Sequence, residues 1–228
     1  MNTLSEEKMP KSFLNLLKQH RIFILTYLFV LIIALLIQLN TTKAELFLWT
    51  NTHYNTFLDH FFTIITFFGD GLTMILFGIG LLFVKYRFGI LTLLAYAYTS
   101  AAAQILKRIF NLPRPSKFFE GVHQIRIVEG NSLHQWNSFP SGHSVSAFSL
   151  AVVLSILLPH RHKHWIILPI AFLTAYSRVY LAQHFFQDIV AGSVLGVVLT
   201  FQLTWWLENA KWYNSPALDG KINFNLTK

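Results

Sequence analysis

The stretch IFILTYLFVLIIALLIQL, residues 22–39, contains no charged residue. A helix needs about 20 apolar residues to cross the hydrocarbon core of a bilayer, so this stretch is long enough to span one. A cleavable signal peptide is the alternative, but the sequence NTTK at residues 40–43 offers no small-x-small cleavage site. The pattern therefore predicts an uncleaved membrane anchor.

Five further apolar segments follow, at residues 57–84, 88–106, 141–158, 165–183 and 185–207. The first of these is interrupted by Gly69-Asp70-Gly71, so it is either one broken span or an interfacial helix followed by a span. We interpret Asp70 as the cap of the downstream helix rather than as a functional carboxylate. The sequence thus predicts an all-α, polytopic membrane protein with six transmembrane helices in a bundle.

A single domain is expected over residues 22–207, with residues 1–21 as a cytoplasmic N-terminal segment and residues 208–228 as a cytoplasmic tail. The longest connection, residues 107–140, separates the third and fourth spans and is predicted to be extracytoplasmic. Connections of this length usually carry function or are disordered.

The composition supports a membrane environment. Hydrophobic residues make up 54% of the 228 residues and charged residues only 12%, against about 25% in soluble chains. The absence of Cys excludes Cys-ligated zinc, iron–sulfur clusters and thiol catalysis. The net charge of +8 favours either a nucleic acid or an anionic lipid as partner, depending on where the charges lie.

The distribution of basic residues predicts the orientation, because cytoplasmic connections are enriched in Lys and Arg. With both termini in the cytoplasm, eleven of the 18 basic residues are inside: Lys8, Lys11, Lys18, Arg21, Lys85, Arg87, Arg161, Lys163, Lys211, Lys221 and Lys228. Seven are then outside: Lys43, Lys107, Arg108, Arg114, Lys117, Arg126 and Arg178.

Three polar clusters lie at the ends of apolar segments, and alternation places all three at the outer face. They are KRIFNLPRP at residues 107–115, FPSGHS at residues 139–144, and Ser177-Arg178 with His184 and Asp188. Each has a structural interpretation when taken alone. The basic residues could anchor span ends at headgroups, and Ser141 could merely cap a helix. His184 and Asp188 are four residues apart, hence on one helical face if the helix is continuous, and could form an interhelical hydrogen-bond pair.

Together the clusters indicate phosphoryl transfer. Lys107, Arg114 and Arg178 supply three cations, and the N–H groups at the start of the fourth span, from Ser141 onward, add a helix N-terminus, which favours a bound anion. Two histidines beside such a site, one oriented by a carboxylate, could attack phosphorus and protonate the leaving oxygen.

The three motifs resemble the signature motifs of the type 2 phosphatidic acid phosphatase family, integral membrane lipid phosphatases related to vanadium haloperoxidases. The matching patterns are K-x(6)-R-P at residues 107–115, P-S-G-H at residues 140–143 and S-R-x(5)-H-x(3)-D at residues 177–188. The resemblance implies that His184 is the nucleophile of a phosphohistidine intermediate and that Asp188 orients it. His143 would be the general acid for the leaving group and then the base that activates water.

The resemblance also implies a phosphate-binding set. Lys107, Arg114 and Arg178, with the Ser141 hydroxyl and the Gly142 amide, would bind the phosphoryl oxygens, and removing one such donor typically costs about 10²- to 10³-fold in rate. The scheme requires no metal and no cofactor. The other histidines are interpreted more plainly: His123 and His134 face water, and the His160-x-His162-x-His164 pattern belongs to a basic cytoplasmic turn.

The expected substrate is a lipid phosphate or diphosphate, such as phosphatidic acid, phosphatidylglycerol phosphate, undecaprenyl diphosphate or a lipid A phosphate. Headgroup selectivity is expected in residues 116–137. The basic residues are then explained by the orientation of the chain in the membrane and by binding of a lipid phosphate, so no nucleic-acid partner is expected. A lipid phosphotransferase and a non-catalytic phospholipid transporter are the alternatives. The compact chain favours a bacterial inner membrane, with the active site at its outer face.

Overall fold

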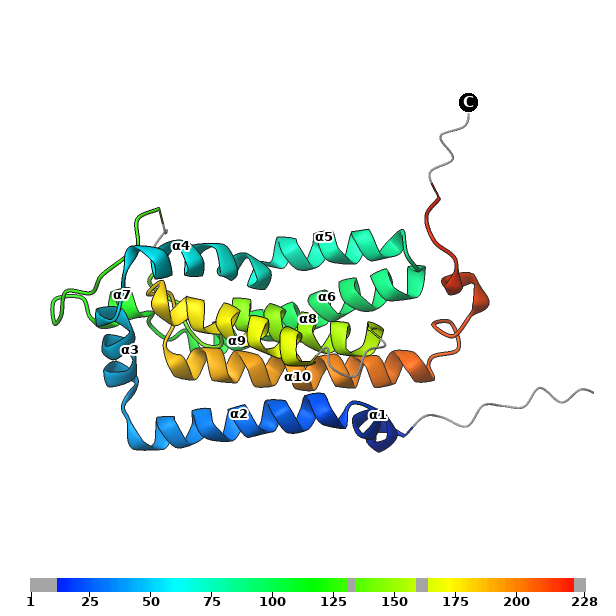
Figure 1. Ribbon diagram of the computed structural model, residues 1–228, viewed down its shortest axis with the longest axis horizontal. Coiled ribbons are helices and arrows are strands. Elements are labelled where there is room, and N and C mark those ends of the chain that lie inside the picture. Colours follow the sequence, from blue (N-terminus) through cyan, green and yellow to red (C-terminus); the bar gives the residue numbers. More distant parts are fainter. Residues whose placement is uncertain (1–11, 131–133, 159–163, 224–228) are drawn as a thin grey trace, which may run out of the picture.

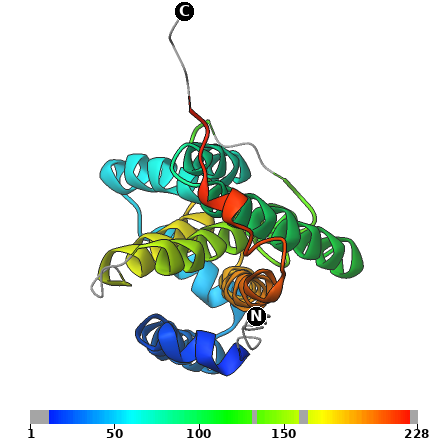
Figure 2. The same ribbon diagram turned by 90° about the vertical axis from the view of Figure 1, so that its right-hand side faces the viewer.

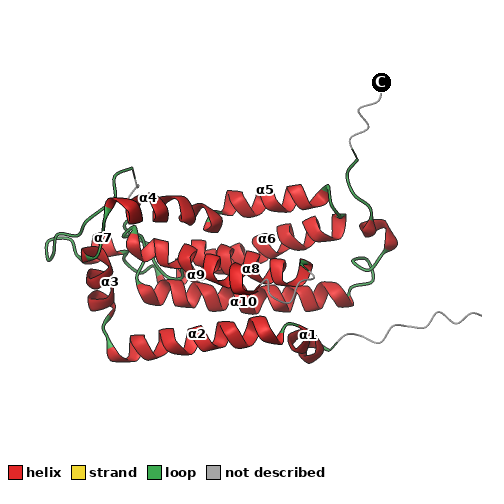
Figure 3. Cartoon of the chain, in the orientation of Figure 1, coloured by secondary structure: helices red, strands yellow, loops and turns green. Residues whose placement is uncertain are grey.

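The structure is a computed structural model that describes residues 12–130, 134–158 and 164–223. Every regular element in these ranges is a helix, which confirms the all-α prediction (Figure 3). The longer helices lie along the long axis of the molecule (Figure 1): α2 (Arg21–Asn40), α4 (Thr56–Ile65), α5 (Gly71–Leu82), α6 (Tyr86–Phe110), α8 (Gly142–Leu157), α9 (His164–Tyr180) and α10 (Phe186–Asn209).

Short elements lie at the two ends of this bundle. Helix α1 (Phe13–Gln19) and the 3₁₀ helix η3 (Pro216–Asp219) lie at one end, whereas α3 (Lys43–Thr52) and α7 (Pro115–Phe118) lie at the other (Figure 1). We call the latter the site end. Both described ends of the chain thus lie at the end opposite α3 and α7. Lys8, Lys11, Arg161, Lys163 and Lys228, which contributed to the predicted orientation, are outside the described residues.

Within the described ranges, three segments are long and apolar enough to cross a membrane: Arg21–Asn40, Tyr86–Phe118 and Phe186–Asn209. The pair Thr56–Gly69 and Gly71–Leu82 passes the same test together and is bent by 55°, so it adds a fourth if it is one span. Helix α8 has 16 residues and α9 has 17, fewer than the roughly 20 of a full crossing. Within the described ranges, three of the six predicted spans, or four with the bent pair, therefore have full length, and the structure does not confirm six.

Helix α8 is the central element, and it packs against α10 at very short range (Figure 2). A Cβ atom on Gly192 would lie 2.6 Å from the Ser141 carbonyl oxygen, and one on Gly196 would lie 2.5 Å from that of Val145. Only glycine permits this approach, as in other membrane helices with small residues four apart. The Thr200 hydroxyl donates to the Ser149 hydroxyl across the same interface at 2.8 Å.

Two helix starts follow from local sequence. Asp70 caps α5, as predicted, by accepting a hydrogen bond from the Leu72 N–H at 2.8 Å. The break at Asp70 is preceded by the 3₁₀ helix η1 (Thr66–Gly69). Helix α3 was not expected, although Thr42 and Glu45 form a capping box in which each side chain accepts from the other's backbone N–H.

Candidate active site

The eight residues predicted to form a site all lie at the site end, and six of them are more than nine-tenths buried: the fully buried Ser141 and five residues with ionisable side chains. Relative exposures are 8% for Lys107, 9% for Arg114, 8% for Arg178, 2% for His184 and 1% for Asp188. Charged side chains are rarely buried this far unless they are paired. The interpretation of Lys107 and Arg114 as exposed interfacial anchors is therefore wrong.

Lys107 and Arg114 are held by the two arms of the connection between α6 and α8. Lys107 Nζ donates to the Asn137 carbonyl at 2.9 Å, and Arg114 Nε donates to the Trp136 carbonyl at 3.0 Å. A backbone hydrogen bond joins the same arms, because the Ser138 N–H donates to the Leu112 carbonyl at 3.0 Å. The beginning and the end of this connection thus close over the start of α8.

Arg114 also reaches the turn between α9 and α10. Its Nη1 donates to the backbone carbonyl and to the side-chain oxygen of Gln183, both at 3.3 Å. Arg178, on the last turn of α9, donates from Nη1 to the Thr66 hydroxyl at 2.8 Å. The three cations are thus positioned by three different parts of the chain: the connection between α6 and α8, the turn after α9, and η1.

His184 and Asp188 meet at the start of α10. The two residues would share one helical face only if their helix were continuous, and it is not, because α10 begins at Phe186. Instead, Asp188 Oδ2 accepts from the Phe185 N–H at 2.9 Å and lies 3.6 Å from His184 Nδ1. The carboxylate reaches His184 because it caps the helix that begins beside it.

Ser138 completes this arrangement. Its hydroxyl donates to Asp188 Oδ2 at 2.5 Å, across 50 residues of sequence. No motif singled out Ser138, and the same holds for Thr66 and Gln183. Each is a common polar residue whose role depends on a long-range contact, so the sequence carried no signal for it.

The start of α8 differs in one respect from the prediction. The Ser141 N–H is not free for an anion, because it donates to the Asp188 carbonyl at 3.0 Å. The Ser141 hydroxyl is the helix cap and accepts from the Ser144 N–H at 3.4 Å. Gly142 lies beside Lys107, since a Cβ at Gly142 would be 3.9 Å from Lys107 Cε. The helix N-terminus therefore offers N–H groups from Gly142 onward.

The charge around the two histidines is positive. The imidazole of His143 interacts electrostatically with Arg178, Arg114 and Lys107, and also with the imidazole of His184. Burial, together with Arg114, Lys107 and Arg178, holds the pKa of His184 well below its usual range. The His184 ring is therefore neutral near pH 7 and retains a nitrogen lone pair.

Several buried polar atoms of the site have no hydrogen-bond partner among the described residues: Arg178 Nε, His184 Nδ1, Asp188 Oδ1 and the Ser144 hydroxyl. Most buried polar groups in folded proteins have a partner. A concentration of unpaired atoms between buried cations indicates a place for a polar, anionic ligand.

The remaining histidines lie away from this cluster. His123 and His134 are exposed, as expected. His160 and His162 are outside the described residues, and His164 is not in an exposed turn: it is buried at the start of α9, with its ring 5.9 Å from that of Phe23. In the described ranges, no three His, Asp or Glu side chains gather as metal ligands would.

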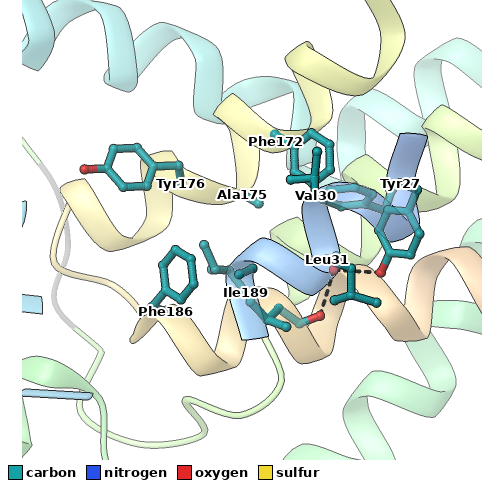
Figure 4. A pocket seen from close by; sticks show the side chains of 12 residues that line it. Tyr27, Val30, Leu31, Phe172, Ala175, Tyr176, Phe186 and Ile189 are labelled. Atoms are coloured by element: carbon teal, nitrogen blue, oxygen red, sulfur yellow. Dashed lines mark hydrogen bonds between the residues drawn. The ribbon is translucent and has the colours of Figure 1, made fainter. Parts of the chain in front are cut away.

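Two recesses of different character lie near the site. A groove between α2, α9 and α10, about 220 Å³ in volume, is lined by apolar side chains such as Val30, Phe172 and Ile189 (Figure 4). A smaller cavity of about 180 Å³ lies between η1, α5, α6 and α8 and is bordered by His143. Only the second includes a residue of the charged cluster, by which we mean Lys107, Arg114, His143, Arg178, His184 and Asp188.

Comparisons with known proteins identify the family. The family model described as the PAP2 superfamily matches residues 88–212, which is more than half of the chain. The lipid A 4'-phosphatase of Porphyromonas gingivalis is 27% identical over 164 residues, which cover 69% of each chain.

Two crystal structures share the fold. That of Aquifex aeolicus LpxE has a TM-score of 0.63 and 29% identity, and the match covers 71% of this chain and 93% of that one. That of a transmembrane PAP2 type phosphatidylglycerolphosphate phosphatase from Bacillus subtilis has a TM-score of 0.59 and 28% identity, covering 83% and 97%. The resemblance found in the three motifs is confirmed, and the chain belongs to the PAP2 superfamily.

Proposed function

We propose that this integral membrane protein is a lipid phosphatase that hydrolyses a lipid phosphate through a phosphohistidine intermediate, without a metal. The observation that carries the proposal is the buried His184–Asp188 pair, 3.6 Å apart, beside three buried cations. Relatives named as lipid A 4'-phosphatase and phosphatidylglycerolphosphate phosphatase support a lipid substrate.

In the first step, a lone pair of His184 forms a bond to phosphorus while the bond from phosphorus to the ester oxygen breaks. His143 donates a proton to that oxygen, so the lipid leaves as an alcohol. Lys107, Arg114 and Arg178, with the Ser141 hydroxyl and the Gly142 N–H, stabilise the negative oxygens as the bonds change. Fixed cations that need no rearrangement suit this role.

In the second step, His143 accepts a proton from water, the water oxygen bonds to phosphorus, and the bond from phosphorus to His184 breaks. The products are inorganic phosphate and neutral His184. Asp188, held by Ser138 and by the Phe185 N–H, keeps the His184 ring in one orientation throughout.

We further propose six membrane-spanning segments within one domain over residues 22–207, with residues 1–21 and 208–228 in the cytoplasm. Helices α8 and α9 would cross as short segments, and α4 and α5 as one bent segment. The site end would then face the outer side of the membrane, which we propose to be a bacterial inner membrane. The location of both described ends of the chain at the end opposite α3 and α7 supports an even number of crossings.

The test is phosphate release by the purified full chain in detergent micelles. Phosphatidic acid, phosphatidylglycerol phosphate, an isoprenyl diphosphate and lipid A are offered in turn, with and without EDTA. His184→Ala should lower the rate at least about 10³-fold, because it removes the nucleophile. The matched control is His123→Ala, which removes an exposed histidine and should leave the rate unchanged.

Equal rates for wild type and His184→Ala would refute the nucleophile, and loss of activity in EDTA would refute the metal-free scheme. If the phosphate appeared on a second lipid instead of in solution, the protein would be a phosphotransferase and not a hydrolase. In wild type quenched during turnover, the intermediate should appear as acid-labile, alkali-stable phosphate on the protein.

A further inference from the structure

The cavity between η1, α5, α6 and α8 includes two residues of the predicted site, Gly142 and His143, and its other lining residues lie outside that site. It borders His143 and is lined by Gly69, Tyr96, Ser100, Gln104 and Ser146, among others. Its volume of about 180 Å³ is several times what one water molecule needs. His184 and Asp188 do not line it.

The polar lining comes mainly from one face of α6. Tyr96, Ser100 and Gln104 are four residues apart and therefore lie above one another along the helix. Gln104 precedes Lys107 by about 4.5 Å along the helix axis, and Ser100 by about 10 Å. The stripe thus leads from the phosphate-binding lysine into the membrane-spanning part of α6.

These side chains have unused hydrogen-bonding capacity. In the described structure, none of Tyr96, Ser100, Gln104 and Ser146 forms a side-chain hydrogen bond to the protein. Thr92 and Thr99 on the same helix differ, since their hydroxyls donate to the carbonyls of Phe88 and Ala95 at 2.9 and 2.8 Å. Ser146 is buried, Tyr96 and Ser100 are half-buried, and Gln104 is exposed at the open side of the cavity. A polar group inside a membrane normally finds an internal partner, so the unpaired hydroxyls of Ser146 and Ser100 point to a ligand that supplies one.

The position of the cavity indicates which part of a substrate it would receive. This step rests on the proposed function. Attacking and leaving atoms lie roughly in line on opposite sides of the transferred phosphorus. His184 is the proposed attacking group and His143 the proposed donor to the leaving oxygen, so the group attached to that oxygen lies on the His143 side, where the cavity is.

We propose that this cavity is the leaving-group subsite and that Ser100, Gln104 and Ser146 determine specificity there. They would bind hydroxyl, ester or amide groups within a few bonds of the phosphate, as in acylated glycerol or acylated sugar phosphates. An isoprenyl monophosphate offers only hydrocarbon at those positions. Selectivity would then lie in α6 and α8 rather than in residues 116–137, where the sequence had suggested it.

The test compares kcat/KM of the full chain for phosphatidic acid and for an isoprenyl monophosphate in the same micelles. Wild type should prefer phosphatidic acid. The double variant Gln104→Leu/Ser146→Ala should lower kcat/KM for phosphatidic acid about tenfold or more and for the isoprenyl monophosphate less than about twofold, since only the first substrate loses hydrogen bonds. Ser155→Ala, on α8 about 13 Å beyond Ser146, is the matched control and should change neither.

A second variant, Ser100→Leu, fills the cavity with hydrocarbon and should shift the preference toward the isoprenyl monophosphate. Equal losses for both substrates, or a wild-type preference for the isoprenyl compound, would overturn the subsite. His184→Ala is measured alongside. If wild type released no more phosphate than His184→Ala from either lipid, the proposed function itself would fall, and the subsite with it.

Discussion

The site end and the groove between α2, α9 and α10 are close neighbours built from opposite kinds of residue. Arg178 belongs to the charged cluster, whereas Tyr176, two residues earlier on α9, lines the groove (Figure 4). On α10, Asp188 contacts His184, and the next residue, Ile189, lines the groove. Successive helical residues point about 100° apart, so single helices contribute to both regions.

The two regions differ in how their polar groups are satisfied. In the groove, the Tyr27 and Ser193 hydroxyls lie 3.0 Å apart, and the Ser193 hydroxyl donates to the Val190 carbonyl at 2.7 Å. In the site, Arg178 Nε and Asp188 Oδ1 have no partner among the described residues. Unpaired buried charge lowers stability, so it persists where a ligand completes it. The groove has no such requirement and offers only an apolar surface.

After His184→Ala, the largest expected effect at the site is from Arg178→Met. It removes a cation from the proposed phosphate site and should lower kcat/KM about 10²- to 10³-fold. It also removes a buried positive charge near Lys107 and Arg114, so the thermal midpoint should stay the same or rise. Arg126→Met is the matched control. It breaks the ion pair with Asp59 and should lower the midpoint while retaining most activity.

Retention of more than a tenth of wild-type activity by Arg178→Met would remove this residue from the site. Activity is measured as phosphate release, and the midpoint by thermal unfolding in the same detergent.

A smaller effect is expected from Ser138→Ala, because Ser138 acts through Asp188. Loss of the 2.5 Å hydrogen bond should lower kcat/KM about 10- to 100-fold, as for other groups that orient a functional residue. Ser138→Thr retains the hydroxyl and should recover much of the activity. A Thr variant as inactive as the Ala variant would indicate a steric role.

The third prediction concerns pH and stability. The folded pKa of His184 is lowered, whereas an unfolded histidine titrates near 6.5. Below about pH 6.5 the unfolded chain therefore binds one more proton at this residue than the folded chain. The contribution of His184 to the free energy of unfolding is therefore complete above about pH 6.5. Below that pH it decreases by at most about 1.4 kcal/mol per pH unit.

His184→Gln removes the titrating group. Wild type should therefore lose more in thermal midpoint than this variant when the pH is lowered from 8 to 5. A difference that is independent of pH would contradict a lowered pKa.

The smallest effect is expected in the groove. Ser193→Ala removes the contact with Tyr27 and should cost about 0.6 kcal/mol, the average for hydrogen bonds between membrane helices. Phosphate release should stay within about twofold of wild type. A loss comparable to that of Ser138→Ala would mean that the groove and the site are not functionally distinct.

The sequence predicted the long helices well because hydropathy reports directly on their length. The run at residues 22–39 corresponds to α2, Arg21–Asn40, and the segment at residues 185–207 to α10, Phe186–Asn209. Helix α3 was missed because its residues are not a long apolar run, although its capping box marked the start.

The site was predicted as a set of side chains but not as a network. Charge and residue type singled out Lys107, Arg178 and His184, whereas their partners include the Asn137 carbonyl and the Thr66 hydroxyl. Backbone carbonyls carry no sequence signal. A single Thr or Ser is recognised as part of the site only when the fold places it beside one of the charged residues. The engagement of the Ser141 N–H with Asp188 was missed for the same reason.

That bond has a mechanical consequence. The Ser141 N–H joins the start of α8 to the Asp188 carbonyl at the start of α10, and the glycines at positions 192 and 196 hold the two backbones in contact just beyond it. His143, two residues after Ser141, and His184, two residues before α10, therefore lie on either side of this backbone contact. We expect a motion that admits a lipid to leave this contact intact and to arise in the elements around it, such as the bend between η1 and α5.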